Sequence, residues 1–302
     1  MSILGAILGA TGSGKSELAV LIAQKLGAEI ICMDSRQLYN GFRIGTAQPS
    51  AEDLRAVPHH LVDFLPPEQQ YNAAEFAKDV KNLLTQRLSA KFILVGGTGL
   101  YMQALCRGLD PLPPSNLEIR EKLKKYYEGK KKELYLDVLK VNPSVEGKIM
   151  QGDTQRLLRI LELKELGYDI YDTGNYRVGG IGFIPSIWLD FPRDELYRRI
   201  NERVVKMLKN GWVEEVEELS RAVPANAFAW QSLGYMELRN ALEKNENPFS
   251  ITESIAIKSR HYAKRQITWF KHKEKPIYID GKTAKSESNL KKISEEFQVS
   301  NN

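Results

Sequence analysis

The sequence predicts an α/β protein in which helices cover a parallel β-sheet and a helical insertion interrupts the core. Strand-like and helix-like segments alternate along the first hundred residues, as they do where crossover helices connect parallel strands. A glycine-rich loop joins the first strand to the first helix, and a charged, helix-rich stretch follows the prolines at positions 111, 113 and 114. The chain has 302 residues, 42% of them hydrophobic, so it can bury a substantial core.

Each element follows from a local pattern. Apolar runs predict strands at residues 3–8, 29–33 and 91–95, and apolar residues at three- to four-residue spacing predict a helix at 15–26. Asn72 and Glu75 form a capping-box pattern at the start of a helix that ends near Leu88, and Ser115 and Glu118 form a second one. Sheet character returns at 187–189 and 277–279, and amphipathic helices are expected at 194–209, 212–221 and 252–272.

This order of elements predicts four parts. The first part of the α/β core is expected at residues 1–110, followed by a helical insertion at 111–185. The chain then returns to the core at 186–280 with further helices. The last part, 281–302, is rich in Lys, Ser, Glu and Asn, and we expect it to be a flexible tail.

Composition excludes several classes of protein. The two cysteines, Cys32 and Cys106, are too few for a disulfide scaffold or a multi-cysteine metal site, and they favour a reducing cytosol. No apolar stretch approaches the roughly 20 residues that span a bilayer, and the first apolar run leads into a glycine-rich loop, as a strand would and a signal peptide would not. We expect a cytoplasmic protein that does not bind membranes and that is a monomer. The net charge of +5 is weak support for a polyanionic partner.

The loop at residues 9–16, GATGSGKS, matches the phosphate-loop pattern G-x-x-x-x-G-K-S/T between a strand and a helix. Glycines let backbone N–H groups surround a phosphate, and the helix N-terminus adds partial positive charge. Lys15 supplies a full charge, and the Ser16 hydroxyl can hold Mg²⁺. The loop predicts a P-loop NTPase-like sheet and a polyphosphate site without identifying the polyphosphate.

An ordinary nucleotide hydrolase would carry a metal-binding acid at the end of a further strand, and that acid is missing here. The strand near 92–95 ends in Gly-Gly-Thr-Gly, with no carboxylate. Asp34 instead follows the second strand, where a side chain of a parallel sheet points into the ligand crevice. Asp34 is either a general base opposite the phosphate site or a cap of the next turn.

Basic residues gather in three places whose roles the sequence leaves open. Residues 258–275 contain seven Lys or Arg and one acid, with aromatic residues among them. They suit RNA phosphates and unstacked bases, or else the aromatics anchor the core while the lysines reach solvent. Arg199 and Arg203 share a helix face that is either solvated or contacts phosphate, and the run at 122–132 alone is typical of a solvated face. His59 and His60 fit a pocket wall better than a metal site.

Several motifs occur in a fixed order over residues 3–280, and together they are specific. They are the phosphate loop, Asp34-Ser35-Arg36-Gln37-Leu38-Tyr39, Ile44-Gly45-Thr46-Ala47, Pro58-His59-His60-Leu61, Gly96-Gly97-Thr98-Gly99-Leu100-Tyr101, Asp153-Thr154-Gln155-Arg156, Gly234-Tyr235 and Lys264-Arg265-Gln266-Ile267-Thr268-Trp269-Phe270. The chain resembles the bacterial tRNA dimethylallyltransferases. The resemblance implies transfer of a dimethylallyl group from dimethylallyl diphosphate to the exocyclic N6 amine of the adenosine 3′-adjacent to the anticodon, with the tRNA anticodon stem-loop as partner and Mg²⁺ as cofactor.

The resemblance also implies roles for individual residues. Asp34 would be the base and Thr98 would lie beside the reacting centre, while Lys15 and Arg203 would assist the leaving group. The diphosphate would be held by Gly9, Ala10, Thr11, Gly12, Ser13, Gly14, Lys15 and Ser16, and the metal by Ser16. The tRNA would be contacted by Asp34, Ser35, Arg36, Gln37, His59, Thr98, Arg120, Gln155, Arg156, Arg159, Gln231, Gly234, Tyr235, Lys264, Arg265, Gln266, Trp269 and Lys271. The chain departs from the family's usual pattern at Arg36, commonly methionine, and at Ala10 and Gly12.

Other functions compete with this one. A small-molecule P-loop kinase, or an isopentenyltransferase acting on free adenine nucleotide, would also use the loop. Neither needs the insertion or the basic and aromatic residues of the 258–275 segment. A nucleotide-controlled RNA-binding protein would need the missing metal-binding acid.

Overall fold

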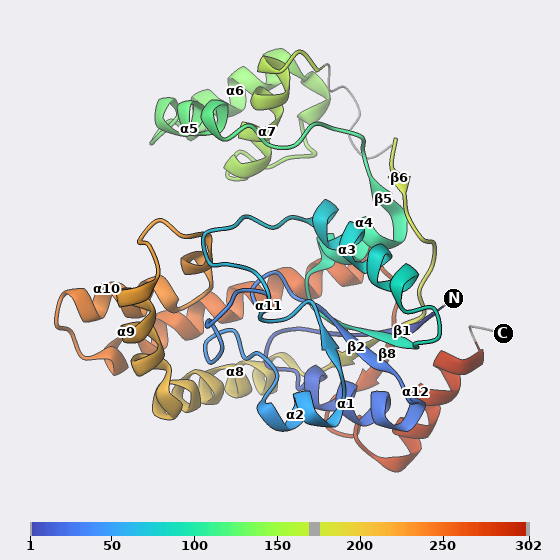
Figure 1. Cartoon of the computed structure of the whole chain (residues 1–302). Helices are drawn as coiled ribbons and strands as arrows, with labels where there is room; N and C mark the ends of the chain where they lie inside the picture. The colour runs from blue at the N-terminus through green and yellow to red at the C-terminus, as the bar shows by residue number, and fades with distance from the viewer. Residues whose placement is uncertain (1, 169–175, 300–302) are drawn as a thin grey trace. The chain divides into compact units, whose positions relative to one another are not determined.

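The computed structural model describes residues 2–168 and 176–299 (Figure 1). The chain divides into a core unit, Met1–Cys106 with Ile181–Asn302, and an insertion unit, Arg107–Gly180. Residues 169–175 of the expected insertion and 300–302 of the expected tail lie outside the described residues. In the part of the chain that the structure describes, no helix is long and apolar enough to cross a membrane.

Six parallel strands form the sheet of the core unit, in the order β3-β2-β4-β1-β7-β8. The strands are β1 (Ile3–Gly9), β2 (Glu29–Met33), β3 (His59–His60), β4 (Phe92–Gly96), β7 (Ser186–Asp190) and β8 (Ile277–Asp280). This confirms the predicted fold class. Because β2, β4 and β1 are neighbours, the loops that follow them meet at one edge of the sheet, where the candidate site residues lie.

Helices cover both faces of this sheet (Figure 1). Helices α1 (Lys15–Leu26) and α12 (Glu287–Val299) lie on one face, and α3 (Ala73–Gln86), α4 (Gly99–Arg107) and α11 (Thr252–Lys273) lie on the other. The capping box of α3 is confirmed, since the Asn72 side chain accepts from the Glu75 N–H and the Glu75 carboxylate accepts from the Asn72 N–H.

Helix α12 corrects the prediction of a flexible tail. Ile293 and Phe297 are buried at 1% and 0% exposure, and Leu290 packs beside them. The Phe297 ring lies against Gly5 of β1, where an added Cβ would come within 2.3 Å of the ring. The polar composition of the tail concealed an apolar stripe with helical spacing, which is enough to dock the helix.

A second layer of helices extends the core unit around a cluster that includes Phe42, Trp212, Trp230 and Tyr235. Its elements are α8 (Arg193–Met207), α9 (Val213–Ala222) and α10 (Tyr235–Glu243), with short turns at Leu208–Trp212, Phe228–Gln231 and Pro248–Ile251. Helix α2 (Ala51–Ala56) has no buried residues and contacts α1. Gly234 permits the start of α10, because its φ is +90° and an added Cβ would lie 2.3 Å from Trp212.

The insertion unit has its own small core, which includes Leu134, Val138 and Leu157. It contains α5 (Leu117–Tyr126), α6 (Lys131–Val141), a turn at Pro143–Val145 and α7 (Thr154–Glu165). At its two ends β5 (Gly108–Leu109) and β6 (Val178–Gly179) form a two-stranded antiparallel sheet. The predicted Ser115–Glu118 capping box is wrong. Asn116 caps α5 by accepting from the Ile119 N–H at 3.1 Å, while the Ser115 hydroxyl donates to the buried Glu162 at 2.8 Å.

Candidate active site

The loops after β1, β2 and β4 bring the predicted site residues together. The phosphate loop follows β1, Asp34 follows β2 and Thr98 follows β4. The Ser35 N–H donates to Thr98 Oγ1 at 3.2 Å, and the Arg36 N–H donates to Asp34 Oδ1 at 2.9 Å. Asp34 therefore caps the next turn, as one of the two alternatives predicts, and its side chain also lines the cavity described below.

The phosphate loop has the backbone that its glycines predict. Gly12 and Gly14 adopt φ values of +83° and +81°, in the left-handed region that favours glycine. Arg199 Nε donates to the Gly12 carbonyl at 2.9 Å, and an Arg203 guanidinium nitrogen donates to Thr11 Oγ1 at 3.3 Å. Both arginines of α8 thus reach the loop and do not form a solvated stripe.

Burial sets the electrostatics of the loop. It lowers the pKa of Lys15 to about 8, with the Asp34 carboxylate opposing the shift and the Arg203 charge adding to it. Burial also lowers the pKa of Arg203, again opposed by Asp34. Two partly desolvated cations beside a loop of backbone N–H groups form a site for an anion, and Asp34 is close enough to interact with both.

A cavity of about 110 Å³, open to solvent, connects these groups. Lys15, Ser16, Asp34 and Arg203 supply polar groups to its wall, together with Tyr262. The apolar part of the wall consists of Ile200, Val204, Met207, Trp212, Leu233 and Ile255. The cavity therefore offers an anion site, a carboxylate and an apolar surface to one ligand.

Tyr262 is a site residue that the sequence presented only as an aromatic of the basic helix. Its side chain hydrogen-bonds to Thr98, and burial raises its pKa to about 12 with the Asp34 charge acting in the same direction. Tyr262 therefore stays a neutral phenol at neutral pH.

A smaller cavity, of about 10 Å³, shares Lys15, Ser16, Asp34 and Gln37 with the first and also contacts His59. The His59 ring lies with Nδ1 2.8 Å from the Val57 carbonyl oxygen, and burial lowers its pKa. His60 instead pairs with Glu29 at 2.6 Å. Among the residues that the structure describes, no group of three or more His, Cys, Asp or Glu is arranged to hold a metal.

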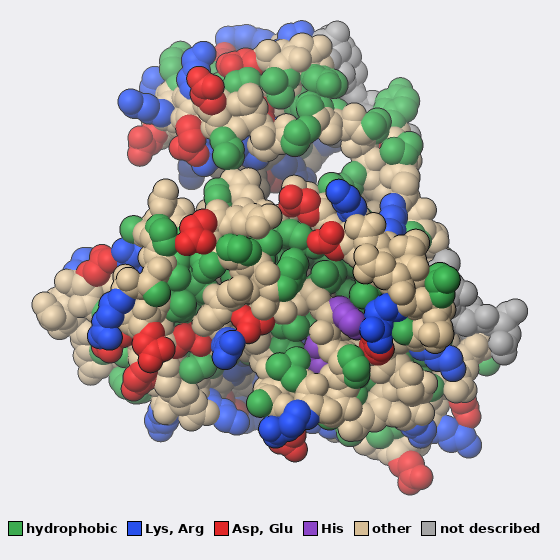
Figure 2. Space-filling view, viewed as in Figure 1, with side chains coloured by type: hydrophobic (Ala, Val, Ile, Leu, Met, Phe, Trp, Pro, Cys, Tyr) green, Lys and Arg blue, Asp and Glu red, His purple; other side chains and the backbone are tan. Residues whose placement is uncertain are grey.

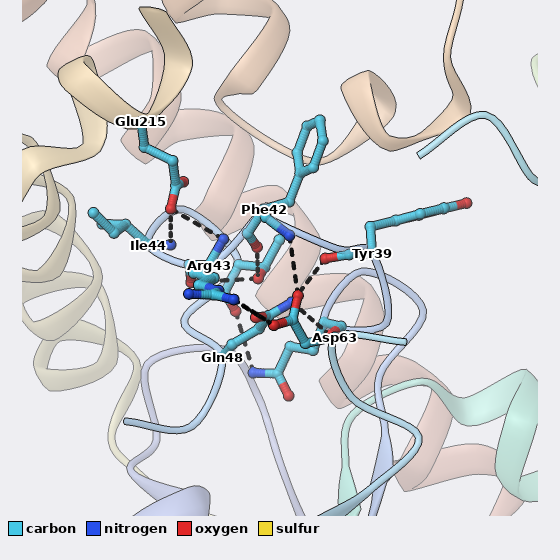
Figure 3. A network of polar contacts seen from close by, with 10 residues as sticks. Tyr39, Phe42, Arg43, Ile44, Gln48, Asp63 and Glu215 are labelled. Carbon is cyan, nitrogen blue, oxygen red and sulfur yellow. Dashed lines mark hydrogen bonds and ion pairs between the residues drawn. The ribbon is translucent and has the colours of Figure 1, made fainter. Parts of the chain in front are cut away.

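A hydrogen-bond network anchors the loop between β2 and α2 that forms part of the cavity wall (Figure 3). The Glu215 carboxylate accepts from the N–H groups of Arg43 at 3.1 Å and Ile44 at 2.8 Å, and from the Tyr235 hydroxyl at 2.6 Å. Burial raises the pKa of Glu215. Sequence reasoning missed Glu215, because an acid in the first turn of an amphipathic helix has the pattern of a surface residue. The Gln37 amide extends the anchoring by donating to the carbonyls of Thr46 and Ala47.

Three residues expected to contact tRNA are buried and corrected here. Tyr235 is fully buried, and its hydroxyl is used by Glu215 and by the Gly45 N–H. Gly234 is buried against Trp212. Gln266 is 4% exposed and bonds to two loops of the site. In this structure their polar groups bond to the protein itself, which corrects the expectation that they are exposed for contact with RNA.

The other residues expected to contact RNA on α11 divide between its two sides. Lys264, Arg265 and Lys271 are exposed. Trp269 packs against Gly99, where an added Cβ would lie 2.1 Å from the indole ring. Gln231, outside this helix, is exposed as expected. The helix therefore carries these basic groups at the surface, while the Trp269 ring packs within the protein.

In the insertion unit, Gln155 and Arg156 are exposed, whereas Arg120 and Arg159 pair with the buried Glu162. The unit also carries exposed basic side chains among acidic ones, as the space-filling view shows (Figure 2). The exposed lysines of its 122–132 segment are Lys122, Lys124, Lys125, Lys130, Lys131 and Lys132.

The fold and the site define a P-loop α/β protein in which a carboxylate faces an anion-binding loop. The model of the family described as IPP transferase matches residues 37–273. The chain is 38% identical to tRNA dimethylallyltransferase 1 of Trichlorobacter lovleyi, covering 88% of this chain and 89% of the relative. It is 35% identical to the tRNA dimethylallyltransferase of Thermosipho melanesiensis, covering 95% and 96%. The chain belongs to the IPP transferase family.

A solved structure agrees with this assignment. The tRNA delta(2)-isopentenylpyrophosphate transferase of Staphylococcus epidermidis superposes with a TM-score of 0.70 at 29% identity, covering 99% of this chain and 100% of that one.

Proposed function

We propose that the protein transfers a dimethylallyl group from dimethylallyl diphosphate to the exocyclic N6 amine of the adenosine 3′-adjacent to the anticodon in tRNA, releasing diphosphate. The observation that carries the proposal is the shared cavity of Asp34, Lys15 and Arg203, which places a carboxylate beside an anion site. The names of the similar proteins agree with it.

The anion site suits the leaving group of an allylic diphosphate. As the bond between the allylic carbon and the diphosphate oxygen breaks, negative charge gathers on the diphosphate and positive charge on the carbon. Lys15, Arg203 and the loop N–H groups stabilise the diphosphate. The apolar part of the wall, which includes Met207 and Leu233, accommodates the hydrocarbon chain.

The carboxylate suits the acceptor. The lone pair of an adenine amine is delocalised into the ring, so the amine needs a base to remove its proton as the C–N bond forms. In this step the nitrogen bonds to the allylic carbon, diphosphate departs with the bonding electron pair, and the amine proton passes to the Asp34 carboxylate. Reaching the cavity requires extrusion of the base from the anticodon loop, at a cost of a few kcal/mol.

Mg²⁺ fits the site as an ion that arrives with the diphosphate. The Ser16 hydroxyl and the Asp34 carboxylate both line the cavity, and oxygen ligands combined with substrate phosphates are what Mg²⁺ prefers. Ser16 would hold the ion, which would neutralise charge on the leaving group when bound.

We propose that the tRNA backbone is bound by the exposed cations of α11, Lys264, Arg265 and Lys271, and by the exposed Gln155 and Arg156 of the insertion. Arg36 lines the cavity and takes part in binding the extruded base. A free-nucleotide isopentenyltransferase would need none of these surface groups.

The test is incubation of the protein with labelled dimethylallyl diphosphate and bulk tRNA, followed by nucleoside analysis. We expect labelled N6-alkyl adenosine, and its absence would refute the proposal. Asp34→Asn should lower the rate by about 10²–10⁴-fold while tRNA affinity stays within a few fold. The matched control is Asp190→Asn, at the end of β7, where the aspartate lines a different cavity. ATP hydrolysis at ordinary enzyme rates would favour a kinase instead.

A further inference from the structure

Gln266 is a buried polar residue that the proposed reaction does not use directly. It lies on α11 with 4% of its surface exposed. Its Oε1 accepts from the Thr11 N–H at 2.9 Å, and its Nε2 donates to the Gly97 carbonyl at 3.0 Å. One partner can only donate and the other can only accept, so the orientation of the amide is fixed.

These two bonds join the two loops between which the proposed reaction takes place. Thr11 belongs to the phosphate loop that follows β1, and Gly97 precedes Thr98 in the loop that follows β4. The approach is close, since an added Cβ on Gly97 would lie 2.2 Å from Gln266 Nε2. The Thr11 N–H of the phosphate loop is therefore held by Gln266.

Neighbouring residues on the same side of α11 reinforce this contact with the β4 loop. Tyr262, one turn before Gln266, hydrogen-bonds to Thr98, and Trp269, one turn after it, packs against Gly99. Three side chains on the same side of α11, each one turn from the next, thus contact residues 97–99. Gln266 is the one of the three that also bonds to the phosphate loop.

We propose that Gln266 is a positioning residue that sets the separation between the phosphate loop and the Thr98 loop, and hence between the leaving diphosphate and the acceptor amine. The proposal rests on the proposed function. Removing the amide leaves the Thr11 N–H and the Gly97 carbonyl without their partner. The two loops are then no longer joined through Gln266. A displacement of about 1 Å in such a site can lower the rate by about 10²-fold.

The experiment compares Gln266→Leu and Gln266→Glu with a matched control, Gln103→Leu, which removes another buried glutamine from α4. For Gln266→Leu we expect kcat/KM for dimethylallyl diphosphate to fall by about tenfold to 10²-fold while tRNA affinity stays within about twofold. The control should leave the kinetic constants close to those of the parent. Thermal unfolding of each variant shows that it is folded at the assay temperature.

Gln266→Glu adds a measurement, the pH dependence of activity, that a purely structural role of Gln266 would leave unchanged. A carboxylate can accept from Thr11, but only its protonated form can donate to the Gly97 carbonyl. The activity of Gln266→Glu relative to the parent should therefore rise as the pH falls, whereas that of Gln266→Leu should stay constant.

Binding of inorganic pyrophosphate separates this proposal from the function on which it rests. If the parent protein makes no alkylated adenosine, the function fails, but weaker pyrophosphate binding by Gln266→Leu still supports the role of Gln266 at the phosphate loop. Unchanged pyrophosphate affinity and unchanged kcat/KM in both folded variants would overturn it, even if their unfolding temperatures fell.

Discussion

Raising the pH above about 8 should weaken diphosphate binding through the titration of Lys15. Burial is the main reason that the pKa of this lysine lies near 8 and not at its usual 10.5. The diphosphate requires the ammonium charge, so the anion binds the protonated form and not the neutral amine. Above this pKa, binding must take up a proton from solvent, and affinity must fall as the pH rises.

The size of the effect follows from the pKa. If only the protonated form binds, the apparent dissociation constant increases by the reciprocal of the protonated fraction. At pH 7 about nine-tenths of Lys15 is protonated and the loss is negligible, whereas at pH 9 the affinity falls by about tenfold, or about 1.4 kcal/mol. With an ordinary lysine pKa, the affinity would be almost constant over the same range.

Calorimetric titration with inorganic pyrophosphate measures this dependence, and buffers of different ionisation enthalpy report the proton taken up. Lys15→Arg is the control, because a guanidinium keeps its charge throughout and should give a flat profile. A parent profile that is equally flat between about pH 7 and pH 9.5, with no proton uptake, would refute the reasoning.

Three further predictions test other parts of the molecule. Neutralising Lys264, Arg265 and Lys271 together should weaken tRNA binding but not pyrophosphate binding. The slope of log affinity for tRNA against log salt concentration should become shallower by roughly 0.7–0.9 for each lost contact. An unchanged slope would exclude these cations from the RNA interface. Phe297→Ala should destabilise the protein by about 3–5 kcal/mol in urea unfolding, and a much smaller loss would mean that α12 is not docked. Glu215→Ala leaves two N–H groups and the Tyr235 hydroxyl without their acceptor, so it should destabilise the protein by at least about 1–3 kcal/mol. Tyr235→Phe removes one of these bonds and the bond from the Gly45 N–H, but it keeps the two N–H groups paired with Glu215, so it should have a smaller effect.

The parts of the fold that were predictable from sequence depend on local patterns. The phosphate loop fixes a strand before it and a helix after it, and the apolar runs of β2 and β4 have the length and isolation of buried strands. Helix α12 was missed because only Leu290, Ile293 and Phe297 form its apolar stripe, and three apolar residues in a polar segment are a weak signal for a docked helix. The Asn116 cap was missed because Ser115, one residue earlier, offers the same pattern, and only the position of Glu162 distinguishes them.

The candidate site shows a similar division. A motif identifies the end of a strand, so Lys15, Asp34 and Thr98 could be placed at one sheet edge without a structure. A motif does not give the direction in which a side chain of a long helix points. For this reason Gln266 was expected among the exposed residues that contact RNA. Glu215 had no signal of its own, since its role depends on the distant backbone of Arg43 and Ile44.

Helix α11 nevertheless carried an unused signal. Its buried positions Ile255, Ser259, Ala263, Gln266 and Phe270 recur every three or four residues, the spacing of a face that packs against a core. Gln266 is the one long polar side chain in that stripe. Because a buried amide must have hydrogen-bond partners, its place in the stripe alone predicts that it bonds to backbone groups of the packed layer. The basic residues that suggested RNA binding, Lys264, Arg265 and Lys271, fall outside the stripe, so periodicity separates the face that supports the cavity from the cations that remain at the surface.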